Sequence, residues 1–277
     1  MKKIIFKLKK VICKILNIEI DSRKIFLNSI PEGISILEIG PFFNPVCVGE
    51  NVAYFDIIDQ EALRARATEI GYKEAINRIP YIDYVSPIGD LNIIHKKFDA
   101  VISCHAIEHQ LDLIAHLQSV SKMLTDGGLY YMIIPDKRYC FDHYMAESTI
   151  AEVLSNYYDK KQTHSLKSVI EHRALTTHNS AMMHWNNSHG NPENVENRIQ
   201  NAIKEYEHAE GKHIDVHAWY FTPYSISKII SMLNKMNYID LAVNKIIPTT
   251  YGNLEFYVVL EPNRVENTKI KIEQGAN

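Results

Sequence analysis

Glycine and acidic residues stand in the first hundred positions at a spacing that suits a nucleoside. Gly40 follows the apolar run 35–39, and Asp56 lies sixteen residues later in a second apolar run, 52–58. A glycine after a strand lets the backbone approach a ligand closely, and an acidic group after the next strand can accept both ribose hydroxyls. Gly89-Asp90-Leu91 offers backbone groups and a carboxylate to an adenine edge. Asp59 is the alternative partner of the ribose.

A second group of reactive side chains follows residue 135. Arg138 is suited to hold an anion, and Asp142 and His143 are candidate bases. Eight of the thirteen histidines lie between 164 and 217. We expect His143 or His217 to be the general base, with packing or surface roles as the alternative. We expect substrate to be bound by Asp136, Arg138, Tyr139 and Trp219.

The histidines could also bind a metal, because imidazole is a common metal ligand. His213 and His217 are four residues apart, and His178, His184 and His189 lie close together in the sequence. A catalytic metal site needs about three protein ligands, usually imidazole or carboxylate. No recognised ligand string is present, so we expect no metal.

These residues must be positioned by alternating strands and helices. Five apolar runs predict strands, and between them lie two segments with helical periodicity, 60–78 and 108–124. Such alternation implies parallel strands in a doubly wound α/β sheet. The predicted strands are 35–39, 52–58, 82–85, 98–104 and 129–134.

The alternation stops after Pro135. Residues 136–222 are predicted to form an inserted cap with helical stretches at 147–158 and 194–209, because the segment is too long for a passive loop. Residues 223–262 are predicted to complete the core of residues 31–135 with a helix that runs to Met236 and a hairpin of strands 239–247 and 254–261.

Several motifs, taken in order, resemble the class I S-adenosylmethionine-dependent methyltransferases. They are ILEIG at 36–40, FDII at 55–58, FDAVISCHAIEH at 98–109 and LTDGGLYYMIIP at 124–135. The resemblance covers residues 34–135 and 220–261, and it implies a mostly parallel seven-stranded Rossmann-like sheet with S-adenosylmethionine as cofactor. For His105, a buried structural role is the alternative to a cofactor contact. By position, the resemblance implies cofactor contacts from Glu38, Gly40, Pro41, Phe42, Asp56, Ile57, Asp90, Leu91, Ser103, Cys104, His105 and His109.

Two departures from that family concern the loop after the first strand. Phe42 stands where the family usually has a second glycine, and only about a dozen residues join the first two strands, too few for a full crossover helix. Glu38 to Pro45 resembles a type 11-like subgroup found with bacterial surface-carbohydrate genes. That likeness implies O-methylation of a saccharide, an activated sugar or a phosphorylated glycan substituent. Small-molecule N-methylation and a non-catalytic protein on the same fold are the alternatives.

Composition excludes several other classes. The 277 residues are 46% hydrophobic with a net charge of −3, which is typical of a globular protein and gives no reason to expect a nucleic-acid partner. The four cysteines are widely spaced, as in reduced cytoplasmic proteins. A nicotinamide oxidoreductase is disfavoured because no Gly-x-Gly-x-x-Gly follows the first strand. We expect a small-molecule or saccharide substrate, and the sequence does not indicate an oligomeric state.

The two ends of the chain differ from the rest. The first twenty residues hold six lysines and one glutamate, with apolar residues on one helical face. We therefore expect residues 1–30 to form a basic amphipathic helix that covers the main domain or makes peripheral contact with anionic lipid. The charged residues 263–277 are expected to form a flexible tail.

Overall fold

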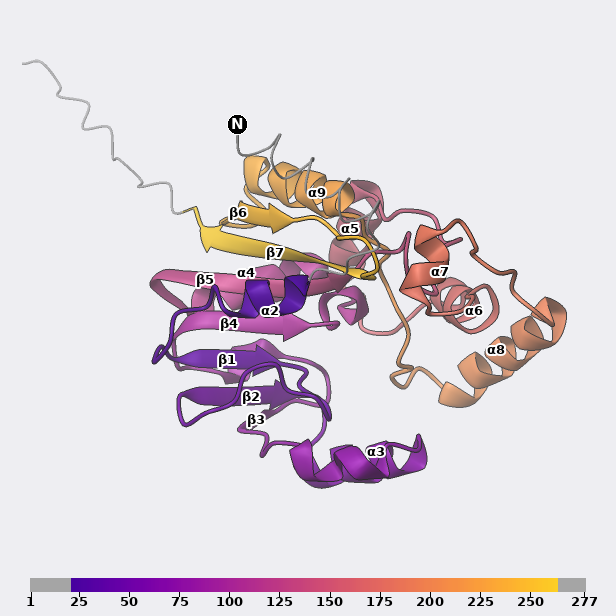
Figure 1. Ribbon diagram of the computed structural model, residues 1–277, viewed down its shortest axis with the longest axis horizontal. Coiled ribbons are helices and arrows are strands. Elements are labelled where there is room, and N and C mark those ends of the chain that lie inside the picture. Colours follow the sequence, from indigo (N-terminus) through magenta and orange to yellow (C-terminus); the bar gives the residue numbers. More distant parts are fainter. Residues whose placement is uncertain (1–20, 264–277) are drawn as a thin grey trace, which may run out of the picture.

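The computed structural model describes residues 21–263 and shows one mixed sheet of seven strands (Figure 1). The sheet order is β3-β2-β1-β4-β5-β7-β6, and β7 runs antiparallel to both of its neighbours. This confirms the predicted doubly wound, mostly parallel sheet. Most of the predicted N-terminal helix (1–30) and of the predicted tail (263–277) lies outside the described residues, and the described part of the former contains the short helix α2 (Ser22–Leu27). The strands are β1 (Ile36–Ile39), β2 (Val52–Asp56), β3 (Tyr84–Val85), β4 (Phe98–Cys104), β5 (Leu124–Pro135), β6 (Leu241–Ile247) and β7 (Glu255–Pro262).

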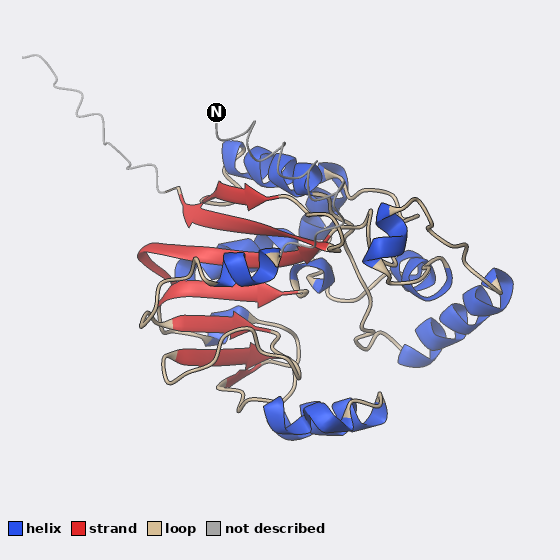
Figure 2. Cartoon of the chain, viewed as in Figure 1, coloured by secondary structure: helices blue, strands red, loops and turns tan. Residues whose placement is uncertain are grey.

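Helices cover both faces of the sheet (Figure 2). α4 (Leu113–Met123) and α9 (Pro223–Lys235) place Leu117, Val120 and Ile230 in the main core with β1, β4, β5 and β7. On the other face, α2 (Ser22–Leu27) inserts Phe26 between Tyr131 and Tyr257, with ring centroids 5.8 and 4.8 Å away. The parallel strands are thus buried on both sides, which explains their continuous apolar runs.

Two predicted helices are shorter than expected. The segment 60–78 is divided into α3 (Gln60–Glu69) and the 3-10 helix η1 (Lys73–Arg78), because Gly71 adopts a φ of +90° that an α-helix cannot contain. The second helix begins only at α4, where the Asp112 side chain caps the amide of Ala115. It is preceded by the 3-10 helix η3 (Ile107–His109).

Asp126-Gly127-Gly128, which lies between the predicted helical segment 108–124 and the predicted strand 129–134, is part of β5. A Cβ atom on Gly128 would lie 3.0 Å from the Phe98 carbonyl oxygen, and the β4–β5 register shifts between Phe98 and Ala100. The glycine is therefore needed where two strand backbones approach closely, and it does not end the strand.

The inserted segment contains four helices, of which the last three lie beyond the carboxyl ends of the parallel strands (Figure 1), whereas the first packs Val153 into the main core. Two correspond to the predicted stretches, whereas α6 and α7 were missed because their sequences are polar and short. α6 and α8 pack through Val169 and Ala202, together with Ile214 and Val216. The helices are α5 (Ile150–Tyr158), α6 (Leu166–Ala174), α7 (Ala181–Trp185) and α8 (Val195–Ala209).

The connection between β1 and β2 contains turns and no helix, as its length predicts. Within residues 21–263, no helix is both long enough and apolar enough to cross a membrane.

Candidate functional site

The carboxyl ends of four neighbouring strands gather the predicted nucleoside-binding residues along one edge. The amide of Gly40 donates to the Phe55 carbonyl at 2.9 Å, and the amide of Ser86 donates to the Asp56 carbonyl at 3.1 Å. A Cβ on Gly40 would lie 3.4 Å from the Cβ of Ala106, which follows β4, and one on Gly89 would lie 4.0 Å from Ile57. Gly40, Asp56, Ile57 and the loop 86–91 therefore share the edge of the sheet that the cap faces.

Asp56 is the buried carboxylate of this edge. Its Oδ1 accepts a hydrogen bond from the Ile57 amide at 2.7 Å. Burial raises the pKa of Asp56, although the backbone amides of Ile57, Ile58 and Phe42 oppose this shift. Asp59, the alternative ribose partner, instead caps α3 by accepting from the Ala62 amide at 2.9 Å. The structure therefore favours Asp56.

Glu38 lies inside the protein and not on the open edge. It is 1% exposed, and its two carboxylate oxygens accept from the amides of Val46 and Cys47 at 2.9 and 3.0 Å. Burial raises its pKa to about 7, although these two hydrogen bonds favour the charged form. Glu38 thus fixes the loop after β1, and the predicted direct cofactor contact is not supported. Pro41, in the same loop, is buried as well.

Phe42 has a backbone conformation that usually favours glycine. Its φ is +43°, in the left-handed region, and Gly40 nearby has a φ of +70°. A side chain in this region costs about 1 kcal/mol. Its ring packs 4.6 Å from that of Phe43, and the Arg66 guanidinium lies 5.4 Å from its centroid. The loop therefore retains a glycine-like path while these contacts offset the strain.

Three other predicted cofactor residues have structural partners. Asp90 caps the 3-10 helix η2 (Leu91–Ile93) by accepting from the Asn92 amide at 2.9 Å, and Leu91 is 3% exposed in the main core. Ser103 is 1% exposed, and its hydroxyl lies 2.8 Å from the Tyr130 hydroxyl. The side chains of Leu91 and Ser103 therefore do not reach the edge, because their strand and helix turn them into the core.

His105 belongs to an ion-pair network that the sequence did not reveal. Its Nε2 lies 2.9 Å from Glu255, which also accepts two hydrogen bonds from Arg23 at 2.8 and 2.6 Å. Although burial opposes it, these partners lower the pKa of Glu255 to about 2. Burial raises the pKa of Cys104 to about 12, so its thiol stays protonated. The network joins α2, the end of β4 and β7, which are distant in sequence.

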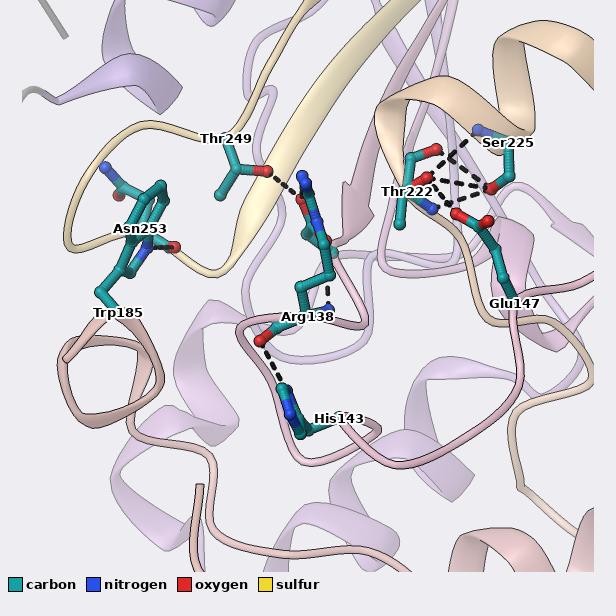
Figure 3. Close-up of polar contacts among 9 residues, drawn as sticks. Arg138, His143, Glu147, Trp185, Thr222, Ser225, Thr249 and Asn253 are labelled. Carbon is teal, nitrogen blue, oxygen red and sulfur yellow. Dashed lines mark hydrogen bonds and ion pairs between the residues drawn. The ribbon is translucent and has the colours of Figure 1, made fainter. Parts of the chain in front are cut away.

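The rim after β5 is held by Asp136, which is fully buried. It accepts from Arg138 Nε and Nη2 at 2.8 and 2.6 Å and from the Thr249 hydroxyl at 2.6 Å (Figure 3). Nε and Nη2 of Arg138 are thus engaged by Asp136, so the predicted role of Arg138 as an anion clamp gains no support. Tyr139 stacks on Trp185 with ring centroids 3.9 Å apart.

His143 presents one nitrogen for chemistry. Its Nδ1 lies 2.9 Å from the Arg138 carbonyl, and Figure 3 shows this contact below the rim. Because a carbonyl only accepts, Nδ1 carries the proton and Nε2 is the basic nitrogen. The ring also stacks on His189 with centroids 3.7 Å apart.

His217 is buried and paired with Asp142. Its Nδ1 lies 2.7 Å from Asp142 Oδ2, and burial lowers the pKa of His217 well below its usual value. A weakly basic imidazole is poorly matched to proton abstraction at neutral pH. The four-residue spacing of His213 and His217 does not place them on one helical face, because residues 212–217 are not helical. His217 instead lies against His109, with ring centroids 4.7 Å apart.

Trp219 is part of the main core and not a platform for a sugar. It is 2% exposed, and its indole N–H donates to the Gln110 carbonyl. The predicted role in stacking on substrate is therefore not supported. His109, predicted to contact the cofactor, lies with its Nδ1 3.0 Å from Asp215, which also pairs with Arg66.

Two hollows of the described chain lie away from Gly40 and Asp56. One of about 390 Å³ is lined by Leu27, Ile36 and Val52, at the amino ends of β1 and β2. Another, of about 170 Å³, opens between α5 and α6 and is lined by Ser148, Asn156 and Tyr220. Neither hollow coincides with the carboxyl edge. We still prefer the carboxyl edge as the candidate site, because open α/β sheets bind ligands there.

Comparison with known proteins gives only distant likenesses. No family model matches the chain, and no curated protein matches it. An S-adenosylmethionine-dependent methyltransferase from Mesorhizobium loti is similar at 24% identity over 42% of this chain and 53% of that one, with a TM-score of 0.30. This chain thus spans about half the length of that enzyme.

Two other solved structures are similar over more of their length. An S-adenosylmethionine-dependent methyltransferase from Clostridium acetobutylicum has 10% identity over 92% of this chain and 98% of that one, with a TM-score of 0.42. The CcbJ methyltransferase from Streptomyces caelestis has 9% identity over 86% and 92%, with a TM-score of 0.43.

Proposed function

We propose that the chain is an S-adenosylmethionine-dependent methyltransferase. The observation that carries this proposal is the meeting of Gly40 and the buried Asp56 at the ends of adjacent parallel strands, on the edge that the cap faces. In this proposal Asp56 accepts the ribose hydroxyls, and the methionyl part lies beside Gly40, which has no side chain to oppose a close approach. S-adenosylmethionine carries no phosphate, so the missing crossover helix is compatible with binding.

The proposed acceptor is a hydroxyl of a saccharide or of an activated sugar. Methyl transfer needs the acceptor oxygen held in line with the sulfonium, and a hydroxyl acceptor also benefits from a base. His143 is the better base of the two predicted histidines, because its Nε2 is available and its ring is only half-buried. The aromatic pair of Tyr139 and Trp185 offers apolar surface near that base.

Calorimetry with S-adenosylhomocysteine tests the proposal. We expect the wild-type chain to bind it, and Asp56→Asn to bind at least tenfold more weakly, a loss of about 1.4 kcal/mol. Asp59→Asn is the matched control, because Asp59 caps α3, and it should bind as the wild type does. Absence of binding to the wild type, or equal affinity in Asp56→Asn, would contradict the assignment.

A further inference from the structure

Glu108 is a buried carboxylate without a protein partner. The residue is 1% exposed, and neither of its carboxylate oxygens has a hydrogen-bond partner within residues 21–263. A buried, unpaired carboxylate costs several kcal/mol unless a cation or a proton neutralises it. The surroundings of Glu108 decide which of these it takes.

Two histidines converge on this carboxylate. One ligand atom each from Glu108, His109 and His217 lies within 4.8 Å of the others. The carbonyl of Glu108 accepts from the amides of Ala218 and Trp219 at 2.7 and 3.1 Å. The backbone thus ties η3 to the segment that carries His217, so the three side chains are held together by the fold.

One of these histidines is oriented by a carboxylate. Asp142 lies 2.7 Å from Nδ1 of His217, and this hydrogen bond fixes the proton there and leaves the Nε2 lone pair for a metal, the arrangement usual around metal-binding histidines. Asp215 lies 3.0 Å from Nδ1 of His109, but that buried nitrogen makes no hydrogen bond within the described residues. Arg66 offsets only the charge of Asp215, so Glu108 and Asp142 leave the cluster acidic.

We propose that Glu108, His109 and His217 bind one divalent transition-metal ion. Two imidazoles and one carboxylate are a ligand set for zinc and for non-haem iron, and they leave a coordination position open. With metal–ligand distances of about 2.0–2.2 Å, two ligands of one ion lie about 3.0–3.6 Å apart, so the three ligand atoms need to approach one another by no more than about 2 Å. This differs from the expectation of no metal, because the sequence did not show that η3 and residue 217 meet.

The position of the cluster gives the ion a role, and this step rests on the proposed function. Glu108 and His109 follow Ala106, whose Cβ lies beside Gly40. A metal at Glu108 would therefore lie next to the edge of the sheet at which we propose that S-adenosylmethionine binds. The open coordination position of the metal can hold an acceptor oxygen there. Metal binding itself does not depend on that role.

Two other groups of side chains compete for an ion. His217 also lies near Asp142 and His172, but its amide already donates to His172 Nδ1 at 3.2 Å. His143, His184 and His189 form a third group without a carboxylate. There, His184 Nε2 lies 3.0 Å from the His178 carbonyl and its Nδ1 lies 3.1 Å from His189 Nδ1, so both nitrogens are engaged.

Titration of chelator-treated protein with Co²⁺, followed by visible absorption and calorimetry, tests the assignment. We expect one tight equivalent in the wild type and at least a tenfold loss of affinity for that equivalent in Glu108→Gln. His172→Asn, which keeps an acceptor near the Nδ1 position, and His184→Gln should retain it. Retention in Glu108→Gln, or loss only in His172→Asn or His184→Gln, would overturn the proposal.

Thermal unfolding of the wild type and of Glu108→Gln shows whether the variant is folded. It also tests metal binding without reference to the methyltransferase assignment. Metal-free Glu108→Gln should melt close to metal-free wild type, because Gln has nearly the same shape and neither carboxylate oxygen has a hydrogen bond to lose within the described residues. Zn²⁺ should raise the Tm of the wild type and not that of Glu108→Gln. S-adenosylhomocysteine affinity is measured in parallel on both proteins without metal, so failure of cofactor binding is distinguished from failure of metal binding.

Discussion

Single residues at the candidate edge divide into those that face it and those that support it. Asp56 and Gly40 lie at the edge, whereas Glu38 holds the loop beneath through two amides. The resemblance in sequence cannot separate these roles, because an acidic residue in a strand has the same identity whether it points to a ligand or to a loop. Burial and hydrogen-bond partners make the distinction.

The buried Glu38 should make the free energy of unfolding depend on pH. Burial raises its pKa from 4.5 to about 7 in the folded chain. The folded state therefore binds the proton more tightly than the unfolded state, and its stability falls as pH rises from about 5 to 8. We expect the wild type to lose about 2 kcal/mol more than Glu38→Gln over this range. Denaturant unfolding at both pH values measures this, and equal losses in the two proteins would contradict it.

At the scale of elements, predictions succeeded where the signal was local. The predicted bounds are close to the observed ones for β1, β2, β4 and α9. Their signals, apolar runs and a Thr-Pro pair at the helix start, depend only on neighbouring residues. The missed helices α6 and α7 bury only Val169, Ala174 and His184. Their weak hydrophobic periodicity does not indicate that α6 packs on α8 or that Trp185 of α7 stacks on Tyr139.

The capping of α9 gives a prediction at this scale. The Thr222 side chain accepts from the Ser225 amide, and its hydroxyl also donates to Glu147 (Figure 3). We expect Thr222→Val to lower the free energy of unfolding by about 1–2 kcal/mol, because the cap and its partner are lost. Chemical denaturation measures it. Tyr224→Phe, in the exposed first turn, should leave stability unchanged; an equal loss there would show that capping is not the cause.

At the scale of the whole molecule, the fold brings distant segments to one edge. His105 and Glu255 meet there with Arg23, and Asp136 meets Thr249. Such pairs are 113 to 232 positions apart in the chain. The sequence predicted the sheet, and its parallel order brings Gly40 and Asp56 to one edge. It could not show that Arg138 is already paired, that Trp219 is buried or that Glu108 faces two histidines, since these depend on long-range packing.

The ion-pair network predicts how the whole molecule is tied together. Arg23 joins α2 to Glu255 of β7 through two hydrogen bonds in a partly buried site. We expect Arg23→Gln to lower the free energy of unfolding by about 1–3 kcal/mol, because the buried Glu255 loses its main partner. Lys24→Gln, one residue along on the exposed side, is the control. Equal stability of the two variants and the wild type would show that the network contributes nothing.

The most direct test of the central claim is a crystal structure of the chain with S-adenosylhomocysteine bound. We predict that the ribose hydroxyls lie within hydrogen-bond distance of the Asp56 carboxylate and that the methionyl part lies beside Gly40 and Ala106. A ligand found in the hollow near Leu27 and Val52, or a carboxyl edge closed to it, would contradict the account.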